Sequence, residues 1–528
     1  MASVVTENFK NVDERSKRVL QLAKDLSVND TKPYHKNIGT ITDLTDLINE
    51  ARTSKERKNV RCIGSYHSVR ESVPADRTEG NSDQRAPDEA GYTINLVGDF
   101  KKFTHREIVK SDGKTYLEVA AGAGCNIGHE NLDHPKDEIS LAEEITKLGY
   151  AFPATGGIIR QTIGGFLSTG SAGGSLVHGL EEIIQSIEFV NGNGQVVLAD
   201  RNGDEESKEL FFAVGVSMGL FGIWTQVKFH FPKNFNVYGC ITTQAFESSN
   251  ISMKEDKTYK LKDSLEKNEY FRANWFPQKY FNKVQEWCGV AEEPGKHEII
   301  PYQDALANKF LAHTASFVLD VMRCLLADGD ASFLDSSAIA LILSLFVREG
   351  KVPFCDVWYK TLPMDNQIEY DVFPVDFTEI WLPIDKCDEV MRKLEDLFQD
   401  PLAQGNFATE IYGAKKSGFW LSMSYGGNYV RVDPYWSRMD WYDKNESSMR
   451  EFFTKFWEAL MPLSPDGCRL HWGKYMPKPG QDIAGTKYNL AYLKKVYPRM
   501  ERWLELRKMH DPDNIFPNKY WREYFEIA

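Results

Sequence analysis

Apolar residues in the first part of the chain follow two periodicities. Within residues 1–55 they recur every three or four positions, for example at Leu44, Leu47 and Ile48, and this spacing predicts helix. Short apolar runs follow, each bounded by small or polar residues, and they predict strands. These runs cover residues 60–63, 92–97 and 116–121. The helical spacing returns over 139–148 and predicts a helix that ends at Gly149.

A hairpin is predicted where two apolar runs, 186–190 and 195–198, flank Asn191-Gly192-Asn193-Gly194, because Asn and Gly accept the positive φ of tight turns. After Pro232 the pattern changes. Aromatic residues and helices are expected over 250–350, then strands near 355–383 and 407–433, and a charged, helical end. We therefore expect domain boundaries near residues 235 and 475.

Composition excludes several classes of protein. The chain has 528 residues, of which 42% are hydrophobic and 26% charged, which is typical of a globular protein. Its net charge is 63 − 76 = −13, so nucleic acid is not an expected partner. The eight cysteines form no CxxC pair, and no metal site is expected. The polar, charged N-terminus predicts no signal peptide, and the C-terminus is no peroxisomal tag.

No stretch is long enough to span a bilayer. The most apolar run, 338–347, has about half of the roughly 20 residues that a span requires. With residues 304–328 it predicts buried or amphipathic helices, and docking on a membrane through 304–349 is the less favoured alternative. A cytoplasmic location follows as the expectation. The polar stretch 72–90 predicts a loop or lid.

Glycine is concentrated between residues 156 and 179, where eight of 24 residues are glycine against 38 in the whole chain. Apolar residues such as Ile163 and Phe166 are interleaved, which a flexible linker would not contain. Backbone N–H groups can approach an anion closely at glycine, so the segment predicts a phosphate-binding loop. It matches neither the Rossmann nor the Walker A pattern. A second loop, 61–68, follows a predicted strand and offers Gly64, Ser65 and His67 to a ligand.

Together these segments resemble the vanillyl-alcohol-oxidase (PCMH) type of FAD-binding family. The resemblance rests on Arg61–Ser68, with the pattern R-x-x-G-x-x-H-S, on Pro153–Gly174, on Phe211–Thr225 and on a C-terminal block. That block contains Arg469–Lys474, which resembles the HWGK motif of the aldonolactone and alditol oxidases, and Asp511–Phe516, which is similar to their ending.

The resemblance implies an α+β fold. It consists of a two-part FAD-binding domain over 1–235, a substrate or cap domain over 236–475 with an antiparallel sheet flanked by helices, and a segment 476–528 that packs back on the FAD domain. It also implies FAD linked covalently to His67 through the 8α-methyl group. No cysteine lies in 153–160, so a second linkage is not expected. The residues implied in cofactor binding are His67, Ile63, Gly64, Ser65, Tyr66, Ser68, Pro153, Thr155, Gly156, Thr162, Gly164, Gly165, Ser168, Thr169, Ser171, Gly174, Gly222, Ile223 and Lys474.

Four residues are the candidates for catalysis. Lys474 could stabilise negative charge on the reduced flavin or position a substrate oxygen. Glu410 is a candidate base or substrate anchor, His471 a polar contact or a structural histidine, and Tyr412 a hydrogen-bond donor or stacking surface. The chain departs from the family pattern at Ser171-Ala172-Gly173, where lactone oxidases often have T-H-G, and at Glu410-Ile411-Tyr412, where they have E-x-R. The loss of that arginine removes a cation from the substrate side.

The function implied is an FAD-dependent oxidase. It would transfer hydride from a C–O or C–N bond of a small molecule to flavin N5 and pass the electrons to O₂, giving hydrogen peroxide. The substrate stays open between a sugar lactone or polyol and another metabolite. The alternatives are a dehydrogenase with a quinone or cytochrome acceptor, a membrane-docked flavoprotein of lipid metabolism, and a flavin binder without activity. The oligomeric state is not predicted.

Overall fold

The computed structural model describes residues 35–54, 58–75, 91–129, 139–303, 340, 343–344, 347–366, 375–437 and 443–528. The helix predicted before residue 34, most of the loop predicted over 72–90 and most of the apolar stretch 304–349 lie outside these residues. Within the described part of the chain, no helix combines the length and the apolar character that crossing a membrane requires.

A small parallel sheet carries the first predicted loop. Its strand order is β1 (His35–Ile38), β3 (Tyr92–Leu96), β2 (Val60–Ile63). Helix α2 (Ile41–Thr53) begins at Thr40, whose side chain accepts from the backbone N–H of Asp43, and buries Leu44, Leu47 and Ile48. The helical pattern expected over 1–55 is thus found from Ile41, whereas β1 was missed because it has only four residues.

A five-stranded antiparallel sheet follows, in the order β4-β5-β8-β6-β7. Its strands are β4 (Phe103–Val109), β5 (Thr115–Gly122), β6 (Ile184–Asn191), β7 (Val196–Asp200) and β8 (Gly222–Phe231). The β6–β7 hairpin was predicted, and its turn holds because the Asn191 side chain accepts from the backbone N–H groups of Asn193 and Gln195 while Gly194 has a φ of 73°. The associated helices are α3 (Leu141–Lys147), α4 (Ile163–Ser168) and α5 (Glu205–Val214).

The largest element is a nine-stranded sheet in the order β12-β9-β11-β10-β15-β16-β14-β17, with β13 also paired to β16. All of its pairs are antiparallel. Its strands are β9 (Asn236–Ala245), β10 (Tyr270–Phe276), β11 (Lys283–Glu292), β12 (Gly350–Val357), β13 (Val375–Phe377), β14 (Ile380–Pro383), β15 (Asn406–Ala414), β16 (Tyr429–Ser437) and β17 (Arg469–Leu470).

Strands β10 and β11 correct the expectation that helices dominate 250–350. Nearly every residue of β10 is buried, on both faces of the sheet. A strand covered on both sides has no alternation of apolar and polar residues, so its period of two was hidden in the sequence.

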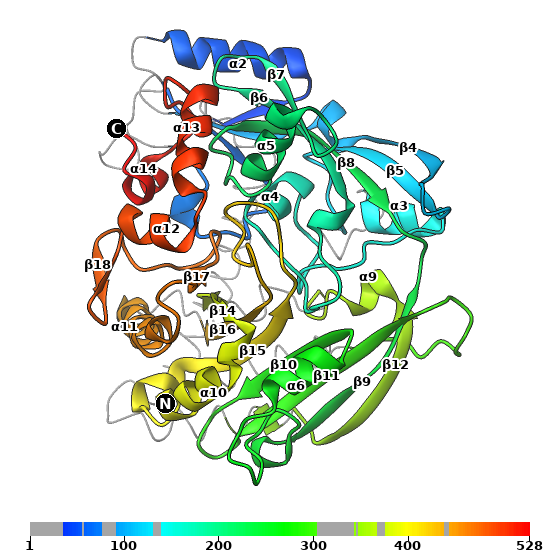
Figure 1. Ribbon diagram of the computed structural model, residues 1–528, viewed down its shortest axis with the longest axis vertical. Coiled ribbons are helices and arrows are strands. Elements are labelled where there is room, and N and C mark those ends of the chain that lie inside the picture. Colours follow the sequence, from blue (N-terminus) through cyan, green and yellow to red (C-terminus); the bar gives the residue numbers. More distant parts are fainter. Residues whose placement is uncertain are drawn as a thin grey trace, which may run out of the picture.

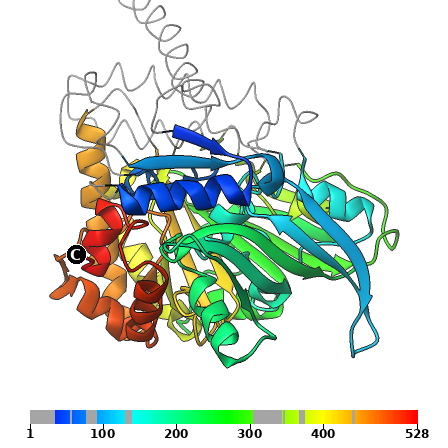
Figure 2. The same cartoon turned by 90° about the horizontal axis from the view of Figure 1, so that it is seen from above.

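Helices cover one face of this sheet. Trp275 of β10 packs edge-on against Phe398 at the end of α10 (Cys387–Leu397), and a Cβ at Gly413 of β15 would lie near Leu265 of α6 (Leu261–Lys267). Helix α10 also contacts α11 (Asp443–Leu460). The opposite face looks towards the smaller sheets, which occupy the upper part of Figure 1, and Figure 2 shows α2 lying across them. Helix α9 (Trp358–Thr361) follows β12.

The C-terminal segment returns to the first half of the chain. It contains β18 (Gln481–Ile483), β19 (Thr486–Tyr488), α12 (Leu490–Val496), α13 (Met500–His510) and α14 (Lys519–Phe525), at the left of Figure 1. Trp503 donates to the carbonyl of Ala213 at 3.0 Å, and the N–H of Val60 donates to the carbonyl of Ile515 at 2.7 Å. The last strand of the five-stranded sheet ends at Phe231 and β9 begins at Asn236, while the domain division itself stays a prediction.

Candidate active site

Two predicted motifs from opposite ends of the chain meet directly. The Lys474 ammonium donates to the carbonyl of His67 at 3.3 Å, and the N–H of Val69 donates to the carbonyl of Gly473 at 2.9 Å. A Cβ at Gly473 would lie 2.9 Å from Ser68 Oγ, so the two segments approach closely and a larger residue at 473 would displace the Ser68 side chain. The loop that follows β2 and the turn that follows β17 therefore form one structure.

Charge at this junction is controlled by burial. Lys474 is half-buried, and burial lowers its pKa to about 8, against the opposing effect of Glu379 and Asp433. Its ammonium lies 3.8 Å from the centre of the Phe377 ring. Burial, with Lys474 and Arg160 nearby, lowers the pKa of His67 to about 3. At neutral pH the imidazole of His67 is therefore uncharged.

His471 shapes the turn that carries Lys474. It is buried, its Nδ1 accepts from the N–H of Gly473 at 3.0 Å, and its carbonyl accepts from the N–H of Lys474 at 3.0 Å. Burial lowers the pKa of His471 to about 4, so the ring is neutral. With Nδ1 acting as the acceptor, the proton resides on Nε2. Of the two predicted roles, these contacts describe the structural one.

The glycine-rich segment packs against the loop of His67. A Cβ at Gly64 would lie 2.5 Å from Thr162 Oγ1, and one at Gly164 would lie 3.2 Å from the carbonyl of Ala123. Thr162 caps α4 by accepting from the N–H of Gly165. Thr155 Oγ1 is buried without a hydrogen-bond partner in the described part of the chain. Close backbone approach and an unused buried hydroxyl fit a cofactor with a phosphate-bearing chain.

The other residues predicted to bind the cofactor lie around this core. Ile63 is buried at the end of β2, Tyr66 is exposed with a φ of 55°, and Ser65 Oγ donates to the carbonyl of Arg160 at 3.0 Å. Pro153 accepts from the Tyr270 hydroxyl at 2.8 Å. Within 156–174, Gly165 is exposed, and Ser168, Thr169, Ser171 and Gly174 are half-buried while Gly156 is buried.

Gly222 and Ile223 lie in β8, in the five-stranded sheet. A Cβ at Gly222 would come within 2.3 Å of the carbonyl of Val190 on β6, so packing within the sheet accounts for this glycine. Ile223 is buried in the core. Their role at the cofactor stays a prediction.

A row of polar side chains faces these loops from the nine-stranded sheet. Side chains alternate along a strand, so Glu410 and Tyr412 of β15 share a face. The register pairs Tyr412 with Arg272 of β10 on one side and with Arg431 of β16 on the other. Glu410 pairs in the same way with Asp433. The sheet thus places residues more than 150 positions apart in one buried cluster.

Glu410 is fully engaged by the protein. Its Oε1 accepts from Arg272 Nη1 at 2.9 Å, and its Oε2 accepts from the hydroxyls of Tyr412 and Tyr435. Arg272 Nη1 also lies 2.6 Å from Asp365 Oδ1. Burial and Asp365 raise the pKa of Glu410 to about 8, and Arg272 opposes this rise.

Arg431 supplies a cation beside Tyr412. Its guanidinium carbon lies 4.3 Å from the centre of the Tyr412 ring, and its Nη1 donates to the carbonyl of Ala172 in the glycine-rich segment at 2.6 Å. The sequence predicted a site that had lost a cation at Tyr412, but Arg272 and Arg431 bring two cations to it from neighbouring strands. The sequence contained one signal of this cluster: Arg431 and Asp433 are two positions apart on a predicted strand, so their side chains lie on the same face.

Glu379 was also missed. Its Oε1 accepts from Trp381 Nε1 at 2.7 Å and lies 3.3 Å from Arg431 Nε. Its carbonyl accepts from the N–H of His471. Burial alone would raise the pKa of Glu379, but Arg431, His471 and Lys474 lower it, so the group is ionised. A lone glutamate before a short strand carried no motif that could have revealed it.

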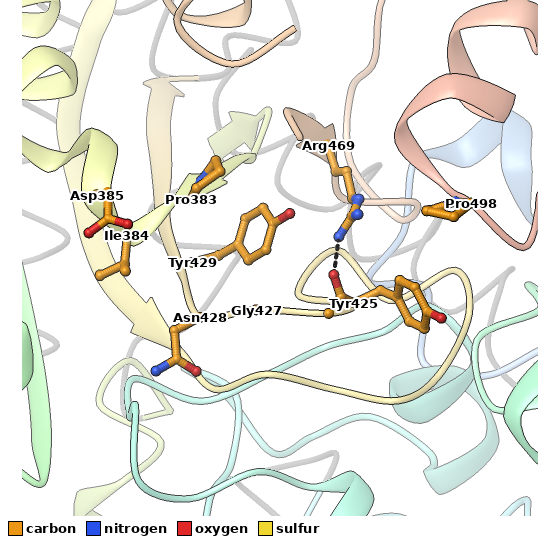
Figure 3. Close-up of a pocket in the computed structure, with 10 residues that line it drawn as sticks. Pro383, Ile384, Asp385, Tyr425, Gly427, Asn428, Tyr429, Arg469 and Pro498 are labelled. Atoms are coloured by element: carbon orange, nitrogen blue, oxygen red, sulfur yellow. Dashed lines mark hydrogen bonds between the residues drawn. The ribbon is translucent and has the colours of Figure 1, made fainter. Parts of the chain in front are cut away.

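An open cavity of about 410 Å³ lies at the edge of the sheet, beyond the end of β14 (Figure 3). Its lining includes Tyr425, Tyr429 and Arg469. The Arg469 guanidinium donates to the carbonyls of Met423, Tyr425 and Val496, so it is occupied in holding loops together. None of the predicted catalytic residues lines this cavity.

Comparison with known proteins gives one family and one fold. The family model described as D-arabinono-1,4-lactone oxidase matches residues 241–524. The D-arabinono-1,4-lactone oxidase of Candida glabrata is 23% identical, over 91% of this chain and 92% of its own length. The L-gulonolactone oxidase of Bos taurus is 21% identical, over 73% of this chain and 78% of its own.

Among solved structures, cholesterol oxidase from Brevibacterium sterolicum superposes with a TM-score of 0.66 at 13% identity, covering 93% of this chain and 94% of that one. This likeness confirms the predicted fold class, an α+β fold with antiparallel sheets.

Proposed function

The chain belongs to the D-arabinono-1,4-lactone oxidase family, and on that premise we propose that it oxidises a sugar lactone or a related polyol with FAD and O₂, releasing hydrogen peroxide. It is an FAD-dependent oxidoreductase. The observation that carries the proposal is the contact between Lys474 and the loop of His67, next to a buried polar face of the substrate sheet.

FAD, when bound, accepts the hydride and passes the electrons on. The chain's own residues would hold it by the loop 63–68 and by the glycine-rich segment 153–174. Lys474 would fix a positive charge where negative charge develops, in a site of low water content where such a charge has its largest effect. The carboxyls and tyrosines of β15 and β16 would orient the substrate hydroxyls.

We further propose that FAD is linked covalently to His67. The lowered pKa of His67 supports this, because a neutral imidazole keeps a lone pair available for bond formation. Denatured wild-type protein should retain its yellow colour and have a mass raised by one FAD. His67→Ala should release the flavin on denaturation. Complete loss of flavin from the denatured wild type would exclude the linkage.

The function is tested by anaerobic bleaching of the flavin with D-arabinono-1,4-lactone and L-gulono-1,4-lactone, with simple amines and primary alcohols as controls. The lactones should bleach the flavin, and air should restore it with one hydrogen peroxide per substrate oxidised. Bleaching by the amines alone would exclude the proposed substrate class. Bleaching that air does not reverse would indicate a dehydrogenase with another acceptor.

A further inference from the structure

Asp433 occupies the centre of the buried polar face. It lies on β16 between Arg431 and Tyr435, opposite Glu410 in the register of the sheet, and its side chain is 2% exposed. The function proposed above gives the carboxyls of β15 and β16 a common role in orienting substrate hydroxyls, but it does not say which carboxyl oxygen makes the contact.

One oxygen of this carboxyl has no partner. Asp433 Oδ2 lies 3.6 Å from Arg431 Nη2, whereas Oδ1 is buried and makes no hydrogen bond within the described residues. The neighbouring acids differ: Glu410 accepts from three side chains, and Glu379 is held by Trp381 and Arg431. A buried acceptor without a partner destabilises a fold, so an unused carboxyl oxygen requires an explanation.

The position of Asp433 connects it to the site around Lys474. The centre of the Phe377 ring lies 3.8 Å from Lys474 Nζ and 4.9 Å from the centre of the Tyr435 ring. The Phe377 side chain therefore lies between Lys474 and Tyr435. Lys474 in turn donates to the carbonyl of His67. Lys474 also acts electrostatically on Asp433. Because side chains alternate along a strand, Asp433 shares a face of β16 with Tyr435, and its carboxyl therefore lies on the side of the sheet that faces this lysine.

We propose that Asp433 is a substrate-binding residue and that its unpartnered oxygen, Oδ1, makes a hydrogen bond with a hydroxyl group of the substrate. This inference rests on the proposed function and deepens it by naming the chemistry of one contact. Burial and Glu379 raise the pKa of Asp433 well above its ordinary value, so the carboxyl can donate as well as accept. A hydroxyl group can likewise donate and accept a hydrogen bond, so it can pair with the carboxyl in either protonation state.

The test compares the FAD-loaded wild type with Asp433→Leu and Asp433→Asn. Anaerobic stopped-flow reduction by increasing D-arabinono-1,4-lactone separates the apparent Kd from the limiting rate. Asp433→Leu should raise the Kd by about 10-fold or more, the effect of losing one good hydrogen bond. Asp433→Asn keeps a donor and an acceptor, so its Kd should stay within about threefold.

Thermal unfolding separates binding from a structural role. Asp433→Leu removes a buried unpartnered oxygen, so its Tm should equal or exceed that of the wild type, and the paired loss of affinity would support the inference. A Kd unchanged in Asp433→Leu would overturn it, as would a fall in Tm or a failure to fold. If no lactone or polyol reduces the wild type, the proposed function fails, and the direction of the Tm change still decides whether Asp433 is structural.

Discussion

Lys474 illustrates how the surroundings of a single residue change its charge. A lysine that follows Trp472 and Gly473 would ordinarily be a solvated surface side chain. Here its ammonium contacts the carbonyl of His67 and the ring of Phe377, and burial lowers its pKa. A cation held in this way stabilises developing negative charge more strongly than one in water.

Removal of this cation should slow reduction of the flavin. Lys474→Met should lower the limiting rate by roughly 100-fold, which corresponds to the loss of about 3 kcal/mol of charge stabilisation. Lys478→Met, at an exposed lysine of the same segment, is the matched control and should leave the rate unchanged. Anaerobic stopped-flow measures both, and equal rates in the two variants would exclude Lys474 from the mechanism.

The same lysine predicts a pH dependence. Its folded pKa is lowered to about 8, so the charged form predominates below that value and is lost as the pH rises through it. The limiting rate of reduction should therefore fall above about pH 8 in the wild type. In Lys474→Met this fall should disappear. If the reduction rate of the variant still falls as the pH rises, the group that titrates is not Lys474.

At the scale of elements, the strands β10, β15 and β16 determine what the site contains. Each contributes alternate polar residues to one face, and the register joins Arg272, Tyr412 and Arg431 in a row. Two loops contact this row. Arg431 donates a hydrogen bond to the carbonyl of Ala172 in the glycine-rich segment, and Asp365, in the segment after α9, forms an ion pair with Arg272. This polar face of the nine-stranded sheet is therefore held by ion pairs as well as by packing.

This ion network should be sensitive to the loss of one partner. Arg272 is 3% exposed and pairs with Glu410 and Asp365. Arg272→Met should destabilise the fold by about 3–5 kcal/mol, because it leaves two acids without their cation. The double variant Arg272→Met/Glu410→Gln should recover part of this loss. Urea unfolding monitors both, and an unchanged midpoint in the single variant would contradict the buried pairing.

The glycine-rich segment should tolerate no side chain where it meets the substrate sheet. A Cβ at Gly174 would lie 2.9 Å from the carbonyl of Phe271 and 3.1 Å from the Tyr412 ring. Gly174→Ala should cost about 1–3 kcal/mol and lower the FAD content. Gly39→Ala is the control, since nothing lies within 4 Å of its Cβ. Equal Tm and flavin content in the two variants would refute the close approach.

At the scale of the whole molecule, the chain closes on itself. The C-terminal helices lie against α5 and against the small parallel sheet, and the HWGK turn joins the loop of His67 (Figure 1). Segments from the two ends of the described chain therefore meet at the loop of His67. The loop of His67 is held by residues Gly473 and Lys474, which are more than 400 positions away in the chain.

Asn518 tests this closure. Its side chain donates to the carbonyls of Glu71 and Pro74 and caps α14. Asn518→Ala should cost about 2–4 kcal/mol, the sum of a cap and two long-range hydrogen bonds. Asn489→Ala, which removes only the cap of α12, should cost about 1 kcal/mol. Calorimetry of both variants decides, and equal costs would mean that the long-range bonds contribute nothing.

The local structural features and the family could be predicted from the sequence. Local structure depends mainly on residues that are neighbours in the sequence. The hairpin at Asn191, the strand before Gly64 and the glycine-rich segment could therefore be predicted from the sequence. The motifs at His67 and Lys474 indicated the FAD-binding fold, which the structural likeness confirms. The assignment of individual site residues stays a prediction.

The set of side chains that meet in the candidate site depends on how the strands pair, which the sequence did not reveal. Arg272 lies on β10, Arg431 lies on β16 and Glu379 directly precedes β14, and their meeting depends on how these distant strands pair. A shift of one residue would turn each side chain to the other face, and no single strand encodes that choice. The family's arginine is replaced by Tyr412, and the sequence alone predicted no cation at this place. The pairing of the strands shows that Arg431, on the neighbouring strand, places its guanidinium beside Tyr412.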